Sequence, residues 1–150
     1  MSLIKPYRNG FQKGFNSYPG TNEKTGIEFE ILITDKDEEH EFGEKENEIA
    51  IVAIDGVGEI FFDNTVISFN RSNWIDIDPT VIHLSPGEKV KIKSTAQSRF
   101  AVIKTSNDLS FKGKVYQPSD IDTEHRGKDQ LDDTCYRLVR LAFDDTISPK

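Results

Sequence analysis

The sequence is poor in residues that form covalent or metal-based cross-links, with one cysteine and three histidines among 150 residues. A single cysteine, Cys135, excludes an intrachain disulfide and any cysteine-based zinc cluster, and we expect a packed thiol. Long apolar runs are also missing: the longest aliphatic run is 49–54, whereas a membrane helix needs about 20 residues. No apolar stretch follows Met1, so we expect no signal peptide and a soluble, cytoplasmic protein with no membrane partner.

Positive charge is scarce as well. The chain has 19 Lys and Arg against 26 Asp and Glu, a net charge of −7. This acidic balance repels a phosphate backbone and excludes nucleic acid as an expected partner. Aromatic residues reach 10%, enough large apolar surface to form a core, so a mainly disordered chain is excluded. The length fits one domain.

Glycine and proline interrupt residues 1–26 too often for a long helix. This segment also carries Tyr7, Phe11, Phe15 and Tyr18, so we expect an extended N-terminal arm that docks through its aromatic rings. From residue 27 the pattern changes to a period of two, which predicts a half-buried strand over 27–34.

Short apolar segments then recur along the chain, separated by turn signals such as Asp55-Gly56 and Ser85-Pro86-Gly87. These segments are predicted strands: 49–54, 60–62, 66–69, 74–77, 81–84, 90–92 and 100–103. Many short strands joined by hairpin turns favour a closed or sandwiched antiparallel sheet, since that architecture removes exposed edges.

Helix signals are weak. Gly127 interrupts the best candidate, 119–131, so we expect a loop with one helical turn there. Residues 135–143 return to a weakly alternating strand pattern. The acidic run 35–48 favours a solvated loop, and a cation site is the less favoured alternative.

Three stretches, taken in order, resemble a known family. The first is Glu48 to Gly56, which looks like the strand, turn and glycine that end the first cupin motif. The second runs from Asp78-Pro79 to His83-Leu84-Ser85-Pro86-Gly87, similar to the second cupin motif and the turn after it. The third, His125-Arg126-Gly127-Lys128 to Thr134-Cys135-Tyr136-Arg137, is similar to the linker between two cupin halves in the 5-deoxyglucuronate isomerase family of bacterial inositol catabolism.

This resemblance implies an all-β fold: a cupin-like double-stranded β-helix, or jelly-roll, barrel with an N-terminal arm and a C-terminal linker strand. It divides the chain into an arm (1–26), a barrel (27–118), and a linker with the start of a missing or partner module (119–150). Because family members are two-cupin chains nearly twice as long, the chain resembles their N-terminal half. A trimmed chain, a split gene and a short stand-alone relative all remain open.

The function that the resemblance implies is ketol isomerisation of a deoxyuronic acid, with the divalent metal held in the family's C-terminal cupin. We therefore expect no cofactor in this chain, which would act mainly as scaffold within a homo-oligomer, with a C-terminal cupin half as a possible partner. The alternative is a stand-alone, non-catalytic cupin that binds a small sugar acid or serves assembly.

The residues themselves argue against a metal site in this barrel. Metal-dependent cupins use two histidines spaced two apart on one strand face, a glutamate and a third histidine. Here His40 is followed two residues on by Phe42, so one required nitrogen is replaced by a hydrocarbon ring. His83 is then favoured as a hydrogen-bonded structural imidazole, and Glu48 fits an inward-pointing ligand or a solvated strand start equally well.

No catalytic residue can be assigned from the sequence, and no metal ligand is expected. The candidate ligand-binding residues are Glu48, Arg71, Trp74, His83, Arg99 and Arg126. The three arginines would bind an anionic ligand at the barrel mouth. Trp74 would stack on a sugar, although a strand aromatic is more often core. A weaker hypothesis has His83 and Glu48 meet a further carboxylate and bind metal.

Overall fold

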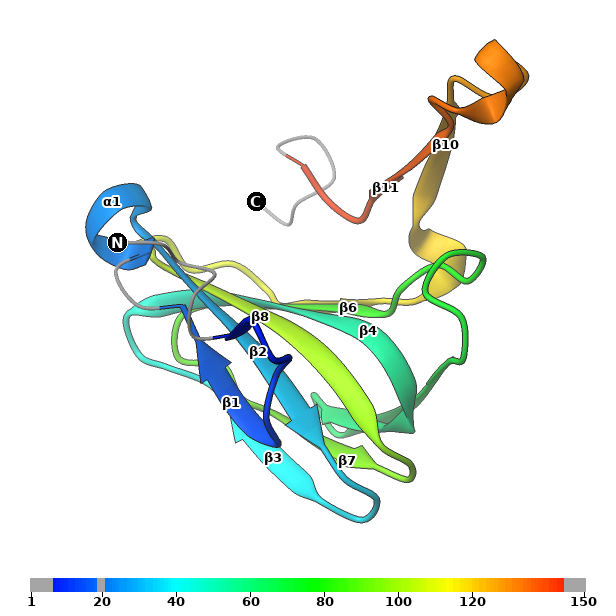
Figure 1. Cartoon of the computed structure of the whole chain (residues 1–150). Helices are drawn as coiled ribbons and strands as arrows, with labels where there is room; N and C mark the ends of the chain where they lie inside the picture. The colour runs from blue at the N-terminus through cyan, green and yellow to red at the C-terminus, as the bar shows by residue number, and fades with distance from the viewer. Residues whose placement is uncertain (1–6, 19–20, 145–150) are drawn as a thin grey trace.

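The chain folds as an all-β protein, as predicted, and its computed structural model describes residues 7–18 and 21–144 (Figure 1). The strands are β1 (Gly14–Ser17), β2 (Ile27–Thr34), β3 (Glu39–Phe42), β4 (Asn47–Phe62), β5 (Thr65–Arg71), β6 (Val81–Leu84), β7 (Val90–Ser94), β8 (Ser98–Ser106), β9 (Lys114–Tyr116), β10 (Asp122–Arg126) and β11 (Arg137–Leu141). Helical segments are short: α1 (Thr21–Thr25) and the 3-10 turns η2 (Pro118–Asp120) and η3 (Leu131–Asp133). In the described residues no helix is long and apolar enough to cross a membrane.

Two antiparallel layers enclose the core, and β4 takes part in both. One layer runs β1-β2-β8-β4-β6-β9; in the other, β3 pairs with β7, and β7 and β5 pair with β4. The first part of β4 pairs with β6 and β8, and its last part, from Gly56, pairs with β5 and β7. β4 therefore links the two layers through a bend near Gly56.

Gly56 is required at this bend for two reasons. Its φ of +120° is one that side-chain-bearing residues rarely adopt, and a Cβ there would lie 2.1 Å from the Ser98 hydroxyl oxygen. The ladder to β8 is also irregular between Ala53 and Asp55. The Asp55-Gly56 pair, a turn signal in the sequence, thus bends one continuous strand instead of ending it.

The core between the layers consists of hydrocarbon side chains. Alternate residues of the central strands supply it, as the period of two predicts. The buried members are Leu32, Phe42, Ile49, Ile51, Ala53, Ile60, Phe69, Ile82, Leu84, Val90, Ile92, Phe100, Val102 and Val115. On β2 this places Leu32 in the core, whereas Ile27 at the start of the strand is exposed.

The N-terminal arm contacts the barrel through its rings, as expected. Tyr7 and Tyr18 lie 4.9 Å apart between ring centroids, and Tyr18 packs on Phe29 of β2 at 5.2 Å. Phe15 meets Phe42 edge to face at 6.1 Å. The arm also supplies β1, which pairs with β2 and widens the sheet. Where the arm, barrel and linker begin and end as units stays a prediction.

Three local predictions are wrong. Residues 74–77 form a turn and not a strand, because Asn73 accepts hydrogen bonds from the backbone N–H groups of Ile75 and Asp76. The acidic run 35–48 is only partly loop, since β3 lies within it and pairs with β7. Segment 119–131 contains β10 besides its helical turns.

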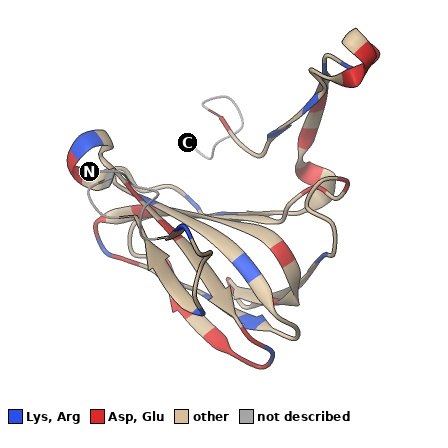
Figure 2. Cartoon of the chain, viewed as in Figure 1, with Lys and Arg blue, Asp and Glu red and all other residues tan. Residues whose placement is uncertain are grey.

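The C-terminal segment forms a hairpin that projects from the barrel and then returns to it (Figure 1). The predicted strand over 135–143 is present as β11, which pairs with β10 from Arg126↔Arg137 to Asp122↔Leu141. Acidic residues recur along β10 and at the hairpin tip (Figure 2). Cys135 is exposed, so the prediction of a packed thiol is wrong; it lies in the exposed hairpin turn rather than against the core.

Candidate functional site

His83 and Glu48 meet on the outer face of the barrel. On β6, Ile82 and Leu84 belong to the core, so His83 points the other way. Its Nε2 lies 2.6 Å from Glu48 Oε1, and the other carboxylate oxygen of Glu48 accepts a hydrogen bond from Asn107 Nδ2 at 2.6 Å. Glu48 is therefore neither an inward ligand nor merely a solvated strand start: it is a hydrogen-bond partner of a buried imidazole.

Two phenyl rings enclose the His83 imidazole. Phe143 stacks on it at 4.1 Å with an interplanar angle of 4°, and Phe111 covers it at 4.5 Å. Its Nδ1 is buried without a hydrogen-bond partner in the described residues. The side chain is only 2% exposed. This arrangement matches the structural imidazole that the sequence favoured. The two phenyl rings leave no room for a ligand from solvent to reach the imidazole.

The further carboxylate that a metal site would need is not assembled beside this pair. In the part of the chain that the structure describes, no three His, Cys, Asp or Glu side chains converge. Asn107 takes the second oxygen of Glu48, where a ligand set would need a further carboxylate or imidazole. The described residues thus do not fit the divalent-metal site of a metal-dependent cupin.

The barrel interior does not fit such a metal site either. On β3, the position two residues after His40, where a metal-dependent cupin has its second histidine, is Phe42. Phe42 is part of the hydrocarbon core. His40, two residues earlier on β3, meets the Phe15 ring edge to face at 5.9 Å, and its Nε2 is 4.0 Å from Glu38 Oε2. Within the described segments His40 belongs to no group of three or more side chains that could hold a metal ion.

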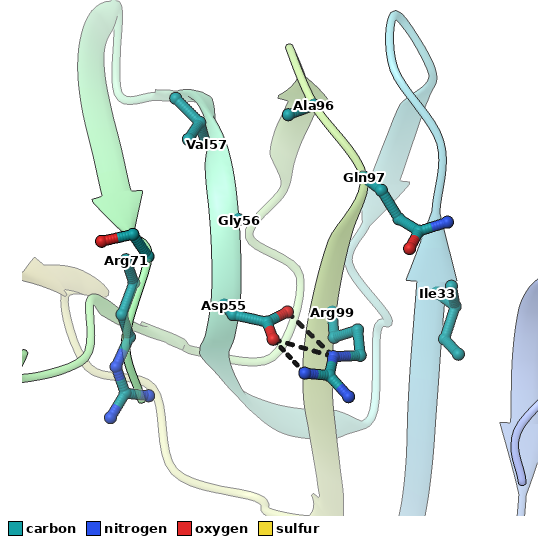
Figure 3. Close-up of a pocket in the computed structure, with 9 residues that line it drawn as sticks. Ile33, Asp55, Gly56, Val57, Arg71, Ala96, Gln97 and Arg99 are labelled. Carbon is teal, nitrogen blue, oxygen red and sulfur yellow. Dashed lines mark hydrogen bonds and ion pairs between the residues drawn. The ribbon is translucent and has the colours of Figure 1, made fainter. Parts of the chain in front are cut away.

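Arg99 and Arg71 line one pocket of about 420 Å³ at the bend of β4 (Figure 3). Its walls are Ile33, Asp55, Gly56, Val57, Arg71, Ser72, Ala96, Gln97 and Arg99. Arg99 Nε donates to both oxygens of Asp55 at 2.9 Å, and this hydrogen bonding raises the pKa of Arg99. Asp55 therefore neutralises the arginine that was expected to bind an anion.

Arg71 has a structural role. Its guanidinium donates to the carbonyl oxygens of Ala53, Trp74 and Ile77, each at 2.8 Å. Burial is the main reason that its pKa lies below the usual value, and the charge of Arg140 lowers it further. Arg71 thus holds the 74–77 turn against β4. Among the described residues, no carboxylate forms an ion pair with its guanidinium.

Trp74 belongs to a second, smaller pocket. It is 58% exposed, so its expected placement in the core is wrong: the turn tied down by Arg71 carries the ring outward. The pocket has a volume of about 260 Å³ and is lined by Trp74, Ile75, Tyr136, Leu138 and Arg140. Sequence reasoning missed Tyr136 and Arg140, because the contacts that bring β11 to this turn join residues more than 60 positions apart.

Arg126 lies on β10 in the projecting hairpin and donates to Glu124 at 2.6 Å. The six candidate residues therefore do not form one site. His83 and Glu48 form a buried pair, Arg71 and Arg99 share one pocket, Trp74 lines another, and Arg126 lies apart from all of them.

Comparisons with known proteins identify related sequences and folds. The sequence model of the KduI/IolB family matches residues 4–149. A crystal structure of an IolB-like protein from Salmonella typhimurium LT2 superposes with a TM-score of 0.75 at 17% identity, covering 93% of this chain and 54% of that chain. The chain thus spans about half the length of that protein. A search of curated proteins gave no match.

Two further structures share the fold at low identity. Ectoine synthase from P. lautus matches with a TM-score of 0.52 at 16% identity, covering 71% of this chain and 77% of that one. A cupin protein from Bacteroides fragilis matches with a TM-score of 0.51 at 19% identity, covering 68% of this chain and 85% of that one. The predicted jelly-roll β fold is confirmed.

Proposed function

The chain belongs to the KduI/IolB family, and from this premise we propose that it is the N-terminal, metal-free cupin half of a 5-deoxyglucuronate isomerase-like protein. Ketol isomerisation of a deoxyuronic acid takes place in a C-terminal cupin, and this half supplies scaffold and oligomer contacts. The proposal places the protein in the cytoplasm and in inositol catabolism.

One observation carries the proposal: the core of the barrel is a continuous cluster of hydrocarbon side chains. Moving a proton between adjacent carbons requires a base and an electrophile that stabilises the enediolate. The buried cluster that contains Phe42 is aliphatic and aromatic, and none of its members is either group. This interior suits a structural module.

The length of the chain relative to the IolB-like protein also supports a structural N-terminal half and a catalytic C-terminal half. The chain covers 54% of the IolB-like structure, so a protein of that length has room for a second module of similar size. The face that carries His83 is sealed in part by Phe143, which follows β11. The segment after the barrel therefore packs against the outer face of the sheet, where a neighbouring module would meet it.

An isomerase assay with metal analysis tests the proposal. The purified chain, with and without added Mn²⁺ or Zn²⁺, is incubated with 5-deoxyglucuronate beside a full-length isomerase of the family as positive control. We expect no turnover and less than stoichiometric metal by mass spectrometry. Turnover by this chain alone, or an ion bound at one equivalent, would overturn the proposal.

A second candidate function is a stand-alone, non-catalytic cupin that binds a small sugar acid. It is favoured by the 420 Å³ pocket, in which Arg71, Arg99 and Asp55 leave an excess of one positive charge. Calorimetric titration with glucuronate separates the two, because saturable binding weakened by Arg99→Gln supports this function, and an absence of heat excludes it for that ligand.

A further inference from the structure

The turn at 74–77 is fixed from two sides by arginines of different strands. Arg71, at the end of β5, donates to the carbonyl oxygens of Trp74 and Ile77. Arg140, on β11, donates to the carbonyl oxygen of Ile75. With three of its four carbonyl oxygens held by guanidinium groups, the turn presents the side chains of Trp74 and Ile75 on a rigid base.

These side chains form one wall of the 260 Å³ pocket, and β11 forms the other through Tyr136 and Leu138. Trp74 is 58% exposed, Ile75 51% and Tyr136 39%. The Tyr136 hydroxyl is held by His125 Nδ1, so this ring is fixed as well. Rigid, exposed aromatic walls of this size are typical of a site that covers the apolar face of a small ligand.

The pocket also contains a preorganised cation. Arg140 Nε donates to Asp78 Oδ1, and Asp78 is in turn bound by the Thr123 hydroxyl at 2.9 Å. The hydrogen bonds to Asp78 and Ile75 use two of the five N–H donors of the guanidinium. The charge of Asp78 acts on Arg71 as well as on Arg140.

From these walls and this charge we propose that the pocket binds a small carboxylate with a flat apolar face, whose carboxylate contacts Arg140 and whose ring lies on Trp74. Both sugar acids and aromatic acids have this chemistry. The pocket lies outside the barrel and shares no lining residue with the 420 Å³ pocket, so the binding does not depend on the scaffold role or on the sugar-acid alternative.

Trp74 is the only tryptophan, so its fluorescence reports this pocket directly. The full chain is titrated with glucuronate and with benzoate, and with uncharged glucose and benzyl alcohol as controls. We expect a saturable change with at least one carboxylate and a weaker or absent change with its uncharged counterpart. The two carboxylates distinguish the sugar-acid source from the aromatic one.

Ile75 offers a matched pair of variants because its side chain is exposed and its substitution leaves the core intact. Ile75→Asp places a negative charge beside the carboxylate of the bound ligand and weakens ligand binding about tenfold relative to the isosteric Ile75→Asn. Arg140→Gln abolishes the change, and circular dichroism checks that this variant is folded.

Three results would overturn the proposal. The first is the absence of a saturable fluorescence change with both carboxylates. The second is equal affinity of Ile75→Asp and Ile75→Asn for the ligand. The third is a Trp74 spectrum that depends on protein concentration without ligand, which would show that a second copy covers the pocket. The isomerase assay uses the parent chain and a different readout, so failure of this binding proposal and failure of the proposed function are distinguished.

Discussion

The Nε2 atom of His83 lies 2.6 Å from Oε1 of Glu48, and this contact joins β6 to the start of β4 on the outer face of the barrel. Phe143 stacks on the same imidazole, so the pair also anchors the chain that returns from the C-terminal hairpin. His83, which the sequence favoured as a structural imidazole over a metal ligand, is thus part of the packing between barrel and hairpin.

Removing the carboxylate tests this structural role. Glu48→Ala leaves the buried Nε2 of His83 without its partner, and we expect a loss of about 1–3 kcal/mol in the free energy of unfolding. Glu41→Ala is the control, because Glu41 is exposed and paired with the exposed Lys89, and its loss should change stability by less than about 0.5 kcal/mol. Urea unfolding measures both; equal midpoints would contradict the structural role of the pair.

Arg71→Lys tests the triple carbonyl contact. An ammonium lacks the planar fork that reaches the carbonyl oxygens of Ala53, Trp74 and Ile77 together, so we expect a loss of at least about 2 kcal/mol. The emission of Trp74 should also change as the turn loosens. Arg99→Lys retains an ion pair with Asp55 and should have a smaller effect. Thermal unfolding with fluorescence detection compares the two, and a reversed order would refute the assignment.

Much of the fold follows from the sequence, because side-chain alternation and turn residues act locally. The strand at 81–84 and the turn at Ser85-Pro86-Gly87 lie where predicted. The strand predicted at 74–77 failed, since its apolar pattern is the same in a strand and in a turn that exposes Trp74 and Ile75. What decides between them is Arg71, whose contacts with this turn have no local pattern.

The candidate sites were harder to predict for the same reason. His83 and Glu48 were each singled out from the chain, but their contact spans 35 residues and depends on the register of β4 with β6. Arg140 was not singled out, because its importance arises only where β11 meets Asp78. Residue type and strand pattern thus identified polar groups, while strand register and the path of the hairpin determined their partners.

The contact of Arg140 with Asp78 should make the docking of β11 sensitive to acid. Burial raises the pKa of Asp78, but the hydrogen bonds from Arg140 and Thr123 outweigh it, and the net pKa lies below the ordinary value of 3.8. A lowered carboxyl pKa stabilises the fold above 3.8, and this stabilisation is lost as the pH falls through the folded-state value.

We therefore expect Asp78→Asn to be less stable than the parent chain at pH 7 and the difference to shrink as the pH falls below 3.8. Urea midpoints from pH 7 to pH 2.5 measure it. Asp63→Asn is the control, since Asp63 is exposed and its ion pair with Lys112, at 3.5 Å, is exposed as well. A difference between Asp78→Asn and the parent that stays constant down to pH 2.5 would exclude this linkage.

The bend of β4 depends on the absence of a side chain at Gly56. Gly56→Ala puts a Cβ 2.1 Å from Ser98 Oγ and 2.7 Å from Ser98 Cα at a φ of +120°, so both strain and overlap oppose it. Gly87→Ala is the matched control, because Gly87 has a φ of +87° but no atom within 4 Å of the added Cβ. We expect Gly87→Ala to cost about 1 kcal/mol from strain alone, and Gly56→Ala about 3 kcal/mol or more. Adding Ser98→Gly removes the overlap with the Ser98 side chain and should restore part of the lost stability. The recovery is incomplete because the contact with the backbone at residue 98 remains. Equal unfolding free energies for the two alanine variants would show that β4 bends without close packing against β8.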